Sequence, residues 1–282
     1  MIRITTLTDN YAAPGFLAEW GLSLWVEAGE LKILVDAGAG FTAVYNAQLL
    51  GLDLGGLDYL VLSHGHYDHT GGLREVLRRV GRRVKIVAHP EVWAPKYARR
   101  GEGTVEAGAG VRYVGIPFAR EELESLGAEF ILQREPVRLG EAALTSGEVP
   151  LITPYEHIDD YLLVRDHNSL IPDPLRDDLA LILKTDYGLV VVLGCAHRGL
   201  INTLRHAQVL TGKERVYGVI GGTHLLHASS ERLDQTAAEL RQMGVEKLVV
   251  SHCTGFHSAA RLAQAFGEAF ILNQAGVTIT FP

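Results

Sequence analysis

Three histidines and an aspartate fall within six residues, in a stretch that directly follows an apolar run at 57–62. That run predicts a buried strand, and the glycines after the cluster predict a turn into a helix over 73–80. The cluster is therefore expected on a loop between a strand and a helix, where α/β proteins often carry their chemistry. Because imidazole nitrogen and carboxylate oxygen are natural ligands of zinc, iron and manganese, the stretch predicts a metal site. Its candidate ligands are His64, His66, Asp68 and His69.

Three later segments each run from an apolar strand through small residues to a histidine. A single histidine in such a place is most often a buried residue with one hydrogen bond. Three at equivalent positions favour a shared metal-binding edge, because the carboxyl ends of neighbouring parallel strands meet at one edge of a sheet. The strands are predicted at 189–193, 217–221 and 247–251, and the histidines are His197, His224 and His252.

The remaining elements give the chain an α/β character. Its first residues alternate like a β-meander, and helical segments separate the later strands in the manner of βαβ units. The third opening strand ends at Asp36, which taken alone is most simply a turn aspartate. Between 95 and 150 the pattern weakens, so we expect an inserted subdomain or lid in which Lys96, Arg99 and Arg100 form a solvated face. Further strands are predicted at 2–7, 22–27, 32–36, 82–89 and 179–185, and helices at 43–51, 119–126, 200–210 and 231–243.

Composition and charge narrow the class of protein. The 282 residues suit one large α/β domain or two small ones, and 47% hydrophobic content is ordinary for a globular protein. A net charge of -7 argues against a nucleic-acid binder. It is compatible with an anionic small-molecule substrate, because bound metal ions reverse the local field. No stretch approaches the ~20 apolar residues of a membrane span, and the strand-like start differs from a targeting segment. We therefore expect a cytoplasmic protein without a membrane partner, whose oligomeric state the sequence does not indicate.

The two cysteines, Cys195 and Cys253, each lie within two residues of a histidine. A disulfide between them is poorly motivated in a cytosolic chain. Two interpretations stay open, namely buried thiols that line the site and metal ligands.

Taken together, these motifs resemble the metallo-β-lactamase superfamily over most of the chain. The strand-end Asp36, the H-x-H-x-D-H cluster at 64–69 and the strand-end His252 carry the resemblance. Three stretches are similar, more narrowly, to its metal-dependent hydrolase branch, often labelled 7,8-dihydropterin-6-methyl-4-(β-D-ribofuranosyl)-aminobenzene-5'-phosphate synthase-like. They are Gly-Cys-Ala-His-Arg-Gly at 194–199, Gly-Gly-Thr-His-Leu at 221–225 and Ser-His-Cys-Thr-Gly at 251–255.

The resemblance implies an αββα sandwich, with two mixed β-sheets face to face, helices outside, and one or two divalent metal ions (Zn, Fe or Mn) at one rim. His64 and His66 would hold the first metal. Asp68 and His69 would hold the second, which His252 would complete. Asp36 would hold the loop by hydrogen bonds rather than ligate, a task that metal sites require.

Two positions depart from the pattern of the superfamily. Asp177-Asp178 stand where a histidine usually precedes the strand at 179–185, and Gly194-Cys195 stand where a bridging aspartate is usual. We expect His197 to replace the missing histidine or otherwise to enter the ligand shell. Cys195 would either lie beside the metals and support their ligands, or occupy the position between them. Water could occupy that position instead. His224 is then a supporting or substrate-facing group.

The function expected from these residues is metal-assisted hydrolysis or transfer at a phosphate ester or similar bond of a small molecule, pterin- or nucleotide-like if the resemblance holds. Asp68 would ligate and also orient the attacking hydroxide. His224 would protonate a leaving group, and Arg198 would contact a substrate phosphate, with a surface salt bridge as an equally weighted alternative. A second hypothesis is a di-iron redox protein or a metal-bound sensor on the same fold. The acidic charge argues against a ribonuclease.

Overall fold

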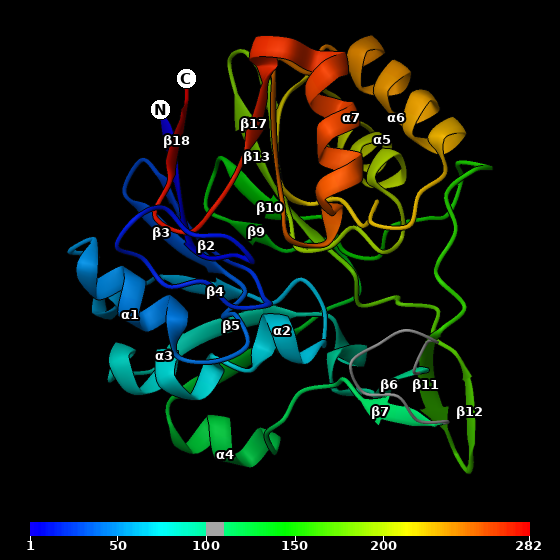
Figure 1. Ribbon diagram of the computed structural model, residues 1–282. Coiled ribbons are helices and arrows are strands. Elements are labelled where there is room, and N and C mark those ends of the chain that lie inside the picture. Colours follow the sequence, from blue (N-terminus) through cyan, green and yellow to red (C-terminus); the bar gives the residue numbers. More distant parts are fainter. Residues whose placement is uncertain (100–109) are drawn as a thin grey trace.

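The computed structural model describes residues 1–99 and 110–282. Its first sheet has seven strands in the order β18-β1-β2-β3-β4-β5-β8. Strands β1, β2 and β3 run antiparallel as a meander, and β3, β4, β5 and β8 run parallel. The first strand pairs with the last, so the two termini lie side by side (Figure 1). The strands are β1 (Ile2–Thr8), β2 (Ser23–Ala28), β3 (Leu31–Val35), β4 (Tyr59–Val61), β5 (Val84–Ala88), β8 (Ala128–Leu132) and β18 (Thr278–Phe281).

The second sheet also has seven strands, in the order β17-β16-β15-β14-β13-β10-β9. A hairpin joins β13 to β14, and β14 to β17 run parallel with helical crossovers between them. The carboxyl ends of three successive strands, β14, β15 and β16, therefore meet at one edge. The strands are β9 (Arg138–Leu139), β10 (Ala143–Thr145), β13 (Ala180–Thr185), β14 (Gly188–Leu193), β15 (Val216–Gly222), β16 (Lys247–Ser251) and β17 (Phe270–Leu272).

The two sheets pack face to face and helices cover their outer faces (Figure 1). Strand β14 shows why the sequence folds this way. Its Val190 and Val192 point into the layer between the sheets, while Leu189, Val191 and Leu193 face the helices. A strand buried on both faces needs an unbroken apolar run rather than alternation, which the sequence of β14 provides. The helices are α1 (Thr42–Leu49), α2 (Tyr67–Thr70), α3 (Leu73–Val80), α4 (Arg120–Ser125), α5 (Leu200–Thr211), α6 (Ser230–Gln242) and α7 (Phe256–Phe266).

The predicted αββα architecture is therefore confirmed, but the predicted insertion at 95–150 is not one unit. Its middle part supplies α4 and β8 to the first sheet, and its last part supplies β9 and β10 to the second. Only its beginning belongs to a separate four-stranded sheet, in the order β12-β11-β6-β7, which also draws on residues after 150. Short strands between loops carry too little periodicity to reveal which sheet they join. The small sheet contains β6 (Lys96–Arg99), β7 (Val111–Tyr113), β11 (Leu162–Asp166) and β12 (Ser169–Pro172).

Among residues 1–99 and 110–282, no helix combines the length and the apolar character that crossing a bilayer requires.

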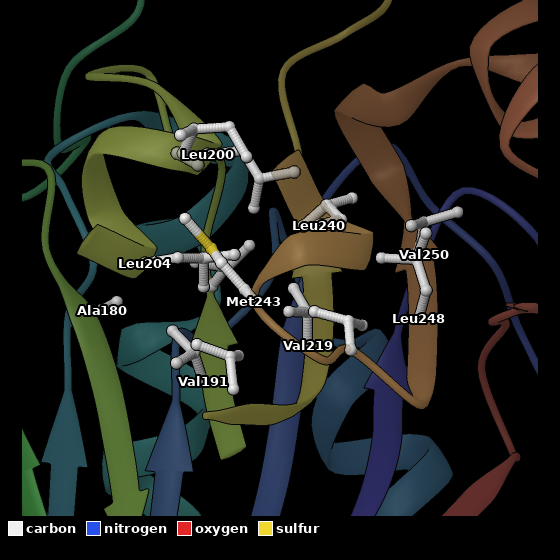
Figure 2. Packing of buried hydrophobic residues seen from close by; sticks show 14 of the residues in the cluster. Ala180, Val191, Leu200, Leu204, Val219, Leu240, Met243, Leu248 and Val250 are labelled. Carbon is white, nitrogen blue, oxygen red and sulfur yellow. The ribbon is translucent and has the colours of Figure 1, made fainter. Parts of the chain in front are cut away.

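The layer beneath α5, α6 and α7 is densely apolar, as Figure 2 shows for the outer face of the second sheet. Leu248 on β16 is fully buried in it. We expect Leu248→Ala to lower the free energy of unfolding by about 2–5 kcal/mol, because a cavity remains after the side chain is truncated. Val209→Ala on α5 is the control, since Val209 is 79% exposed, and its change should stay within about 0.5 kcal/mol. Urea unfolding measures both, and equal losses would contradict this packing.

Candidate metal centre

The ends of five strands meet at one rim of the sandwich and carry the predicted site. On the first sheet, β3 leads into Asp36 and β4 leads into the His64 loop. On the second sheet, β14, β15 and β16 lead into the segments of Cys195, His224 and His252. Several of these strand ends turn sharply, with left-handed backbone at Asp36 (φ 59°), Ala196 (φ 55°), His224 (φ 50°) and His252 (φ 52°). Such conformations cost energy in residues other than glycine, and they concentrate where function fixes a side chain.

A first group of imidazoles converges at His64. The Nε2 atom of His64 lies 2.9 Å from Nδ1 of His66 and 3.2 Å from Nε2 of His197. One ring nitrogen has a single lone pair, so these contacts cannot all be good hydrogen bonds. Two nitrogens bound to a tetrahedral zinc at about 2.0–2.1 Å lie about 3.3–3.4 Å apart, close to the spacing seen here. The three nitrogens therefore fit a metal ion, and the structure brings His197 to the predicted ligand shell.

The tautomer of His64 is set by its neighbours. The Ser63 hydroxyl donates to Oδ2 of Asp36 at 2.7 Å, so its oxygen must accept the hydrogen bond of 2.9 Å from Nδ1–H of His64. The Nε2 lone pair then faces the centre, as a metal ligand requires. Burial and the neighbouring imidazoles lower the pKa values of His64 and His197, and burial lowers that of His66 to about 3. All three rings are therefore neutral, which is the form that binds metals.

A second group lies beside the first, around His69. Its Nδ1–H donates to Oδ2 of Asp36 at 2.7 Å, while Nε2 points at Sγ of Cys195 at 3.1 Å. His252 is held in a similar way. Its Nδ1 lies 3.0 Å from Oδ1 of Asn10, and its Nε2 lies 3.4 Å from Oδ2 of Asp68. Burial alone would lower the pKa of His69, but the charge and hydrogen bond of Asp36 outweigh it and raise that pKa to about 9.

Cys195 is shared between the two groups. Its sulfur lies within 4.8 Å of the ligand atoms of His64 and His197 in one set, and of those of His69 and His252 in another. Burial raises the pKa of the Cys195 thiol, and a metal ion bound here would displace its proton, so Cys195 could serve as a ligand for either group. Cys253, also a free buried thiol, accepts instead from the main-chain N–H of His224 at 3.3 Å.

His224 stands next to the metal groups rather than within either. Its ring centroid lies 4.0 Å from that of His197, and its Nε2 donates to Oδ2 of Asp159 at 2.9 Å. Burial lowers the pKa of His224, but the hydrogen bond that it donates to Asp159 and the neighbouring Cys253 sulfur outweigh this and raise the pKa to about 10. The sequence analysis did not identify Asp159, because it lies in a proline-rich loop that has no periodicity by which it could be placed at the rim.

The structure corrects two predictions about basic residues. Arg198, for which a substrate phosphate and a surface salt bridge were equally weighted alternatives, instead directs its guanidinium to the backbone carbonyls of Val149 and Pro174. Lys96, predicted on a solvated face, is 1% exposed and pairs with Asp173 and Asp177, each at 2.8 Å. Arg99 is exposed, as predicted, and Arg100 lies outside the described residues.

The Lys96 pair explains what Asp177 does in place of the usual histidine. Oδ2 of Asp177 accepts the main-chain N–H of Gly65 at 2.8 Å, which fixes the loop between His64 and His66. Only glycine fits there, because a Cβ on Gly65 would lie 2.1 Å from the carbonyl oxygen of Val92. Asp178 accepts the main-chain N–H of Arg198 at 2.8 Å. The two aspartates therefore position the ligand loops.

Fold and site together define a metal-binding protein with an αββα sandwich and its ligands at one rim. The family model described as Metallo-beta-lactamase superfamily matches residues 21–252. The chain is 30% identical to 7,8-dihydropterin-6-methyl-4-(beta-D-ribofuranosyl)-aminobenzene-5'-phosphate synthase of Methanocaldococcus jannaschii, across 99% of this chain and 97% of that protein. It therefore belongs to the metallo-β-lactamase superfamily.

Two further comparisons agree over nearly the full length. An uncharacterized protein of the same organism, MJ0448, is 31% identical across 94% of each chain. The crystal structure of Tm1679, a metal-dependent hydrolase of the beta-lactamase superfamily, has a TM-score of 0.84 at 27% identity and covers 100% of this chain and 99% of its own. The small sheet at β6 and β11 is thus part of an architecture shared with a solved relative.

The inferred role of Cys195 as a metal ligand can be tested with Cys253 as the control. In cobalt-substituted protein, a cysteine ligand produces thiolate-to-metal charge-transfer absorption. We expect Cys195→Ser to abolish this absorption and to weaken metal binding at least about tenfold, because its sulfur belongs to all three candidate ligand groups, whereas Cys253→Ser should retain most of both, because its sulfur belongs only to the group with His224. Absorption spectra and competition with a chelator measure the two effects. Undiminished charge transfer in Cys195→Ser would contradict the assignment.

Proposed function

We propose that this protein is a metal-dependent enzyme that hydrolyses or transfers at a phosphate-containing small molecule of pterin or nucleotide type. The observation that carries the proposal is that Cys195 is shared by three candidate ligand groups, one with His64 and His197, one with His69 and His252, and one with His224 and Cys253. In the first two groups, hydrogen bonds to Ser63, Asp36 or Asn10 turn a ring Nε2 toward the centre. Similarity over nearly the full length to a synthase whose name contains a pterin and a ribosyl 5'-phosphate supports the substrate class.

The ligand set favours particular metals. Imidazole nitrogens with a central thiolate suit zinc or iron better than manganese, which prefers oxygen ligands. We infer one ion held by His64, His66 and His197, and a second held by Asp68, His69 and His252, with Cys195 between them. A divalent ion bound here would act as a Lewis acid on a substrate oxygen and lower the pKa of a bound water.

The chain's own residues supply proton transfer and orientation. Asp68 remains ionised, because hydrogen bonding to His252 and the surrounding imidazoles hold its pKa below the usual range in spite of burial. It can therefore ligate with one oxygen and orient a nucleophile with the other. His224 carries its proton at neutral pH, and its Nδ1 makes no hydrogen bond among the described residues. That N–H is free to protonate a leaving group, with Asp159 holding the ring in place.

The test begins with the metal. In the double variant His64→Ala/His66→Ala we expect bound metal, measured by mass spectrometry, to fall from one or two ions per chain to below one. Turnover in a screen of phosphomonoesters, phosphodiesters and pterin phosphates should fall about 10³-fold or more, because each 1.36 kcal/mol of lost metal assistance costs about a factor of ten.

The matched control is His167→Ala, since His167 is an exposed histidine outside the site. It should keep both metal and turnover. Unchanged metal stoichiometry in a folded double variant would overturn the metal centre. Stoichiometric iron without turnover of any phosphate compound would instead favour the redox alternative on the same fold.

A further inference from the structure

A second cavity adjoins the metal centre. The cavity over the metal ligands is small, about 110 Å³, and is lined by His66, His197 and His224 among others. The neighbouring cavity measures about 410 Å³, within the range of small-molecule sites. His224 lines both, and Asp159 lines the larger one, so the two cavities meet at this hydrogen-bonded pair. A substrate that reacts at the metals therefore has room to extend past His224.

The wall of the larger cavity contains a largely buried cation that no carboxylate of the described residues contacts. Arg232 lines the cavity and is only 9% exposed. Within residues 1–99 and 110–282 its guanidinium makes no ion pair or hydrogen bond, and its Nε atom is fully buried without a partner. By contrast, Arg205 on α5 pairs with Glu239 at 2.7 Å. A guanidinium at a cavity wall without a contacting carboxylate is available to an anionic ligand.

The start of α6 adds a second attraction for an anion. Ser229 caps this helix of 13 residues by accepting the main-chain N–H of Arg232 at 3.2 Å, and Ser229 also lines the cavity. The first turn of a helix presents free N–H groups and the positive end of the dipole. Three carboxylates are nearby: Asp159 is engaged by His224, Glu156 accepts the main-chain N–H groups of Ile201 and Asn202, and Glu231 is exposed at the rim. Asp159 and Glu156 attract Arg232 through space, but among the described residues no carboxylate contacts its guanidinium.

We propose that this cavity binds a phosphate group of the substrate, with Arg232 as its counter-charge. A guanidinium and helix N–H groups together match the geometry and charge of a phosphate monoester. The proposal rests on the function proposed above and deepens it, because the phosphate bound at Arg232 is held apart from the bond that reacts at the metals. Arg232 thus contacts the substrate phosphate, a task that the sequence analysis considered for Arg198.

Calorimetry on the metal-loaded protein tests the site with two probes, inorganic phosphate and ribose 5-phosphate, and with ribose as the blank. We expect Arg232→Gln to raise the Kd of both phosphates by about tenfold to hundredfold, because it removes a charge-assisted contact. Arg232→Lys, which keeps the charge, should lose no more than about fivefold. The matched control is Arg241→Gln on the same helix, where the guanidinium donates to the carbonyl of Ala265; its Kd should change less than about twofold. Equal Kd values in wild type and Arg232→Gln overturn the site.

Thermal unfolding separates a binding role from a structural one. Without phosphate, Arg232→Gln should melt at or above the wild-type temperature, since an unpaired buried charge is removed. The rise in Tm that phosphate produces in the wild type should be lost. A lowered Tm with an intact phosphate response would assign Arg232 to folding alone. If Arg232→Gln does not fold, Arg232→Lys decides, because loss of the phosphate response there also overturns the proposal.

The double variant His64→Ala/His66→Ala keeps this test independent of the proposed function. Phosphate binding should persist in it within about threefold, because the phosphate lies at Arg232 and not on the metals. Loss of binding in the double variant would place the phosphate on the metals and overturn the inference. Conversely, wild-type protein that binds phosphate through Arg232 but turns over no phosphate ester would leave the cavity assigned and refute the enzyme.

Discussion

The metal centre depends on one buried carboxylate, that of Asp36. It is fully buried and accepts the main-chain N–H of Ser63 at 2.8 Å, the Ser63 hydroxyl at 2.7 Å and Nδ1–H of His69 at 2.7 Å. Hydrogen bonds to a charged group contribute about 1.5–3 kcal/mol each, enough to offset much of the cost of burying it. Through Ser63 the carboxylate also sets the tautomer of His64. A single side chain thus orients one ligand in each of the two groups.

Asp36 can orient a ligand in each group because the two sheets approach each other closely at this rim. Gly194 directly follows β14 on the second sheet, and a Cβ there would lie 2.0 Å from Oγ of Ser63 and 3.0 Å from Oδ2 of Asp36. The absence of a side chain lets the strand that carries Cys195 and His197 approach the loop that carries His64. The strained backbone at Asp36 and His252 is maintained by the same packing, since the layers around it are fully buried. The packing of the sandwich therefore holds the site residues in place.

The sequence predicted those parts of this arrangement that repeat along the chain. Apolar runs followed by histidines identified the strand ends, and three such ends with one dense cluster indicated a metal edge. The sandwich was implied only by the resemblance to the metallo-β-lactamase superfamily. The pattern could not reveal contacts made by isolated residues. Asp159 and Arg232 lie far apart in sequence and carry no spacing relative to the cluster, and only the fold brings them to one cavity. The prediction of one inserted subdomain at 95–150 was wrong for a related reason, because the short strands of this segment join three different sheets.

Three buried or half-buried cations near the site show why residue type alone did not locate the substrate. Lys96 is neutralised by two carboxylates, and Arg198 is taken up by backbone carbonyls. Both therefore stabilise loops that hold metal ligands. Arg232 is 9% exposed, and neither a carboxylate nor a backbone carbonyl of the described residues contacts its guanidinium. Folded proteins seldom leave a charge unpaired without a functional reason, because the penalty consumes a large part of a marginal stability. What distinguishes a binding residue here is the absence of an internal partner, which only three-dimensional structure can show.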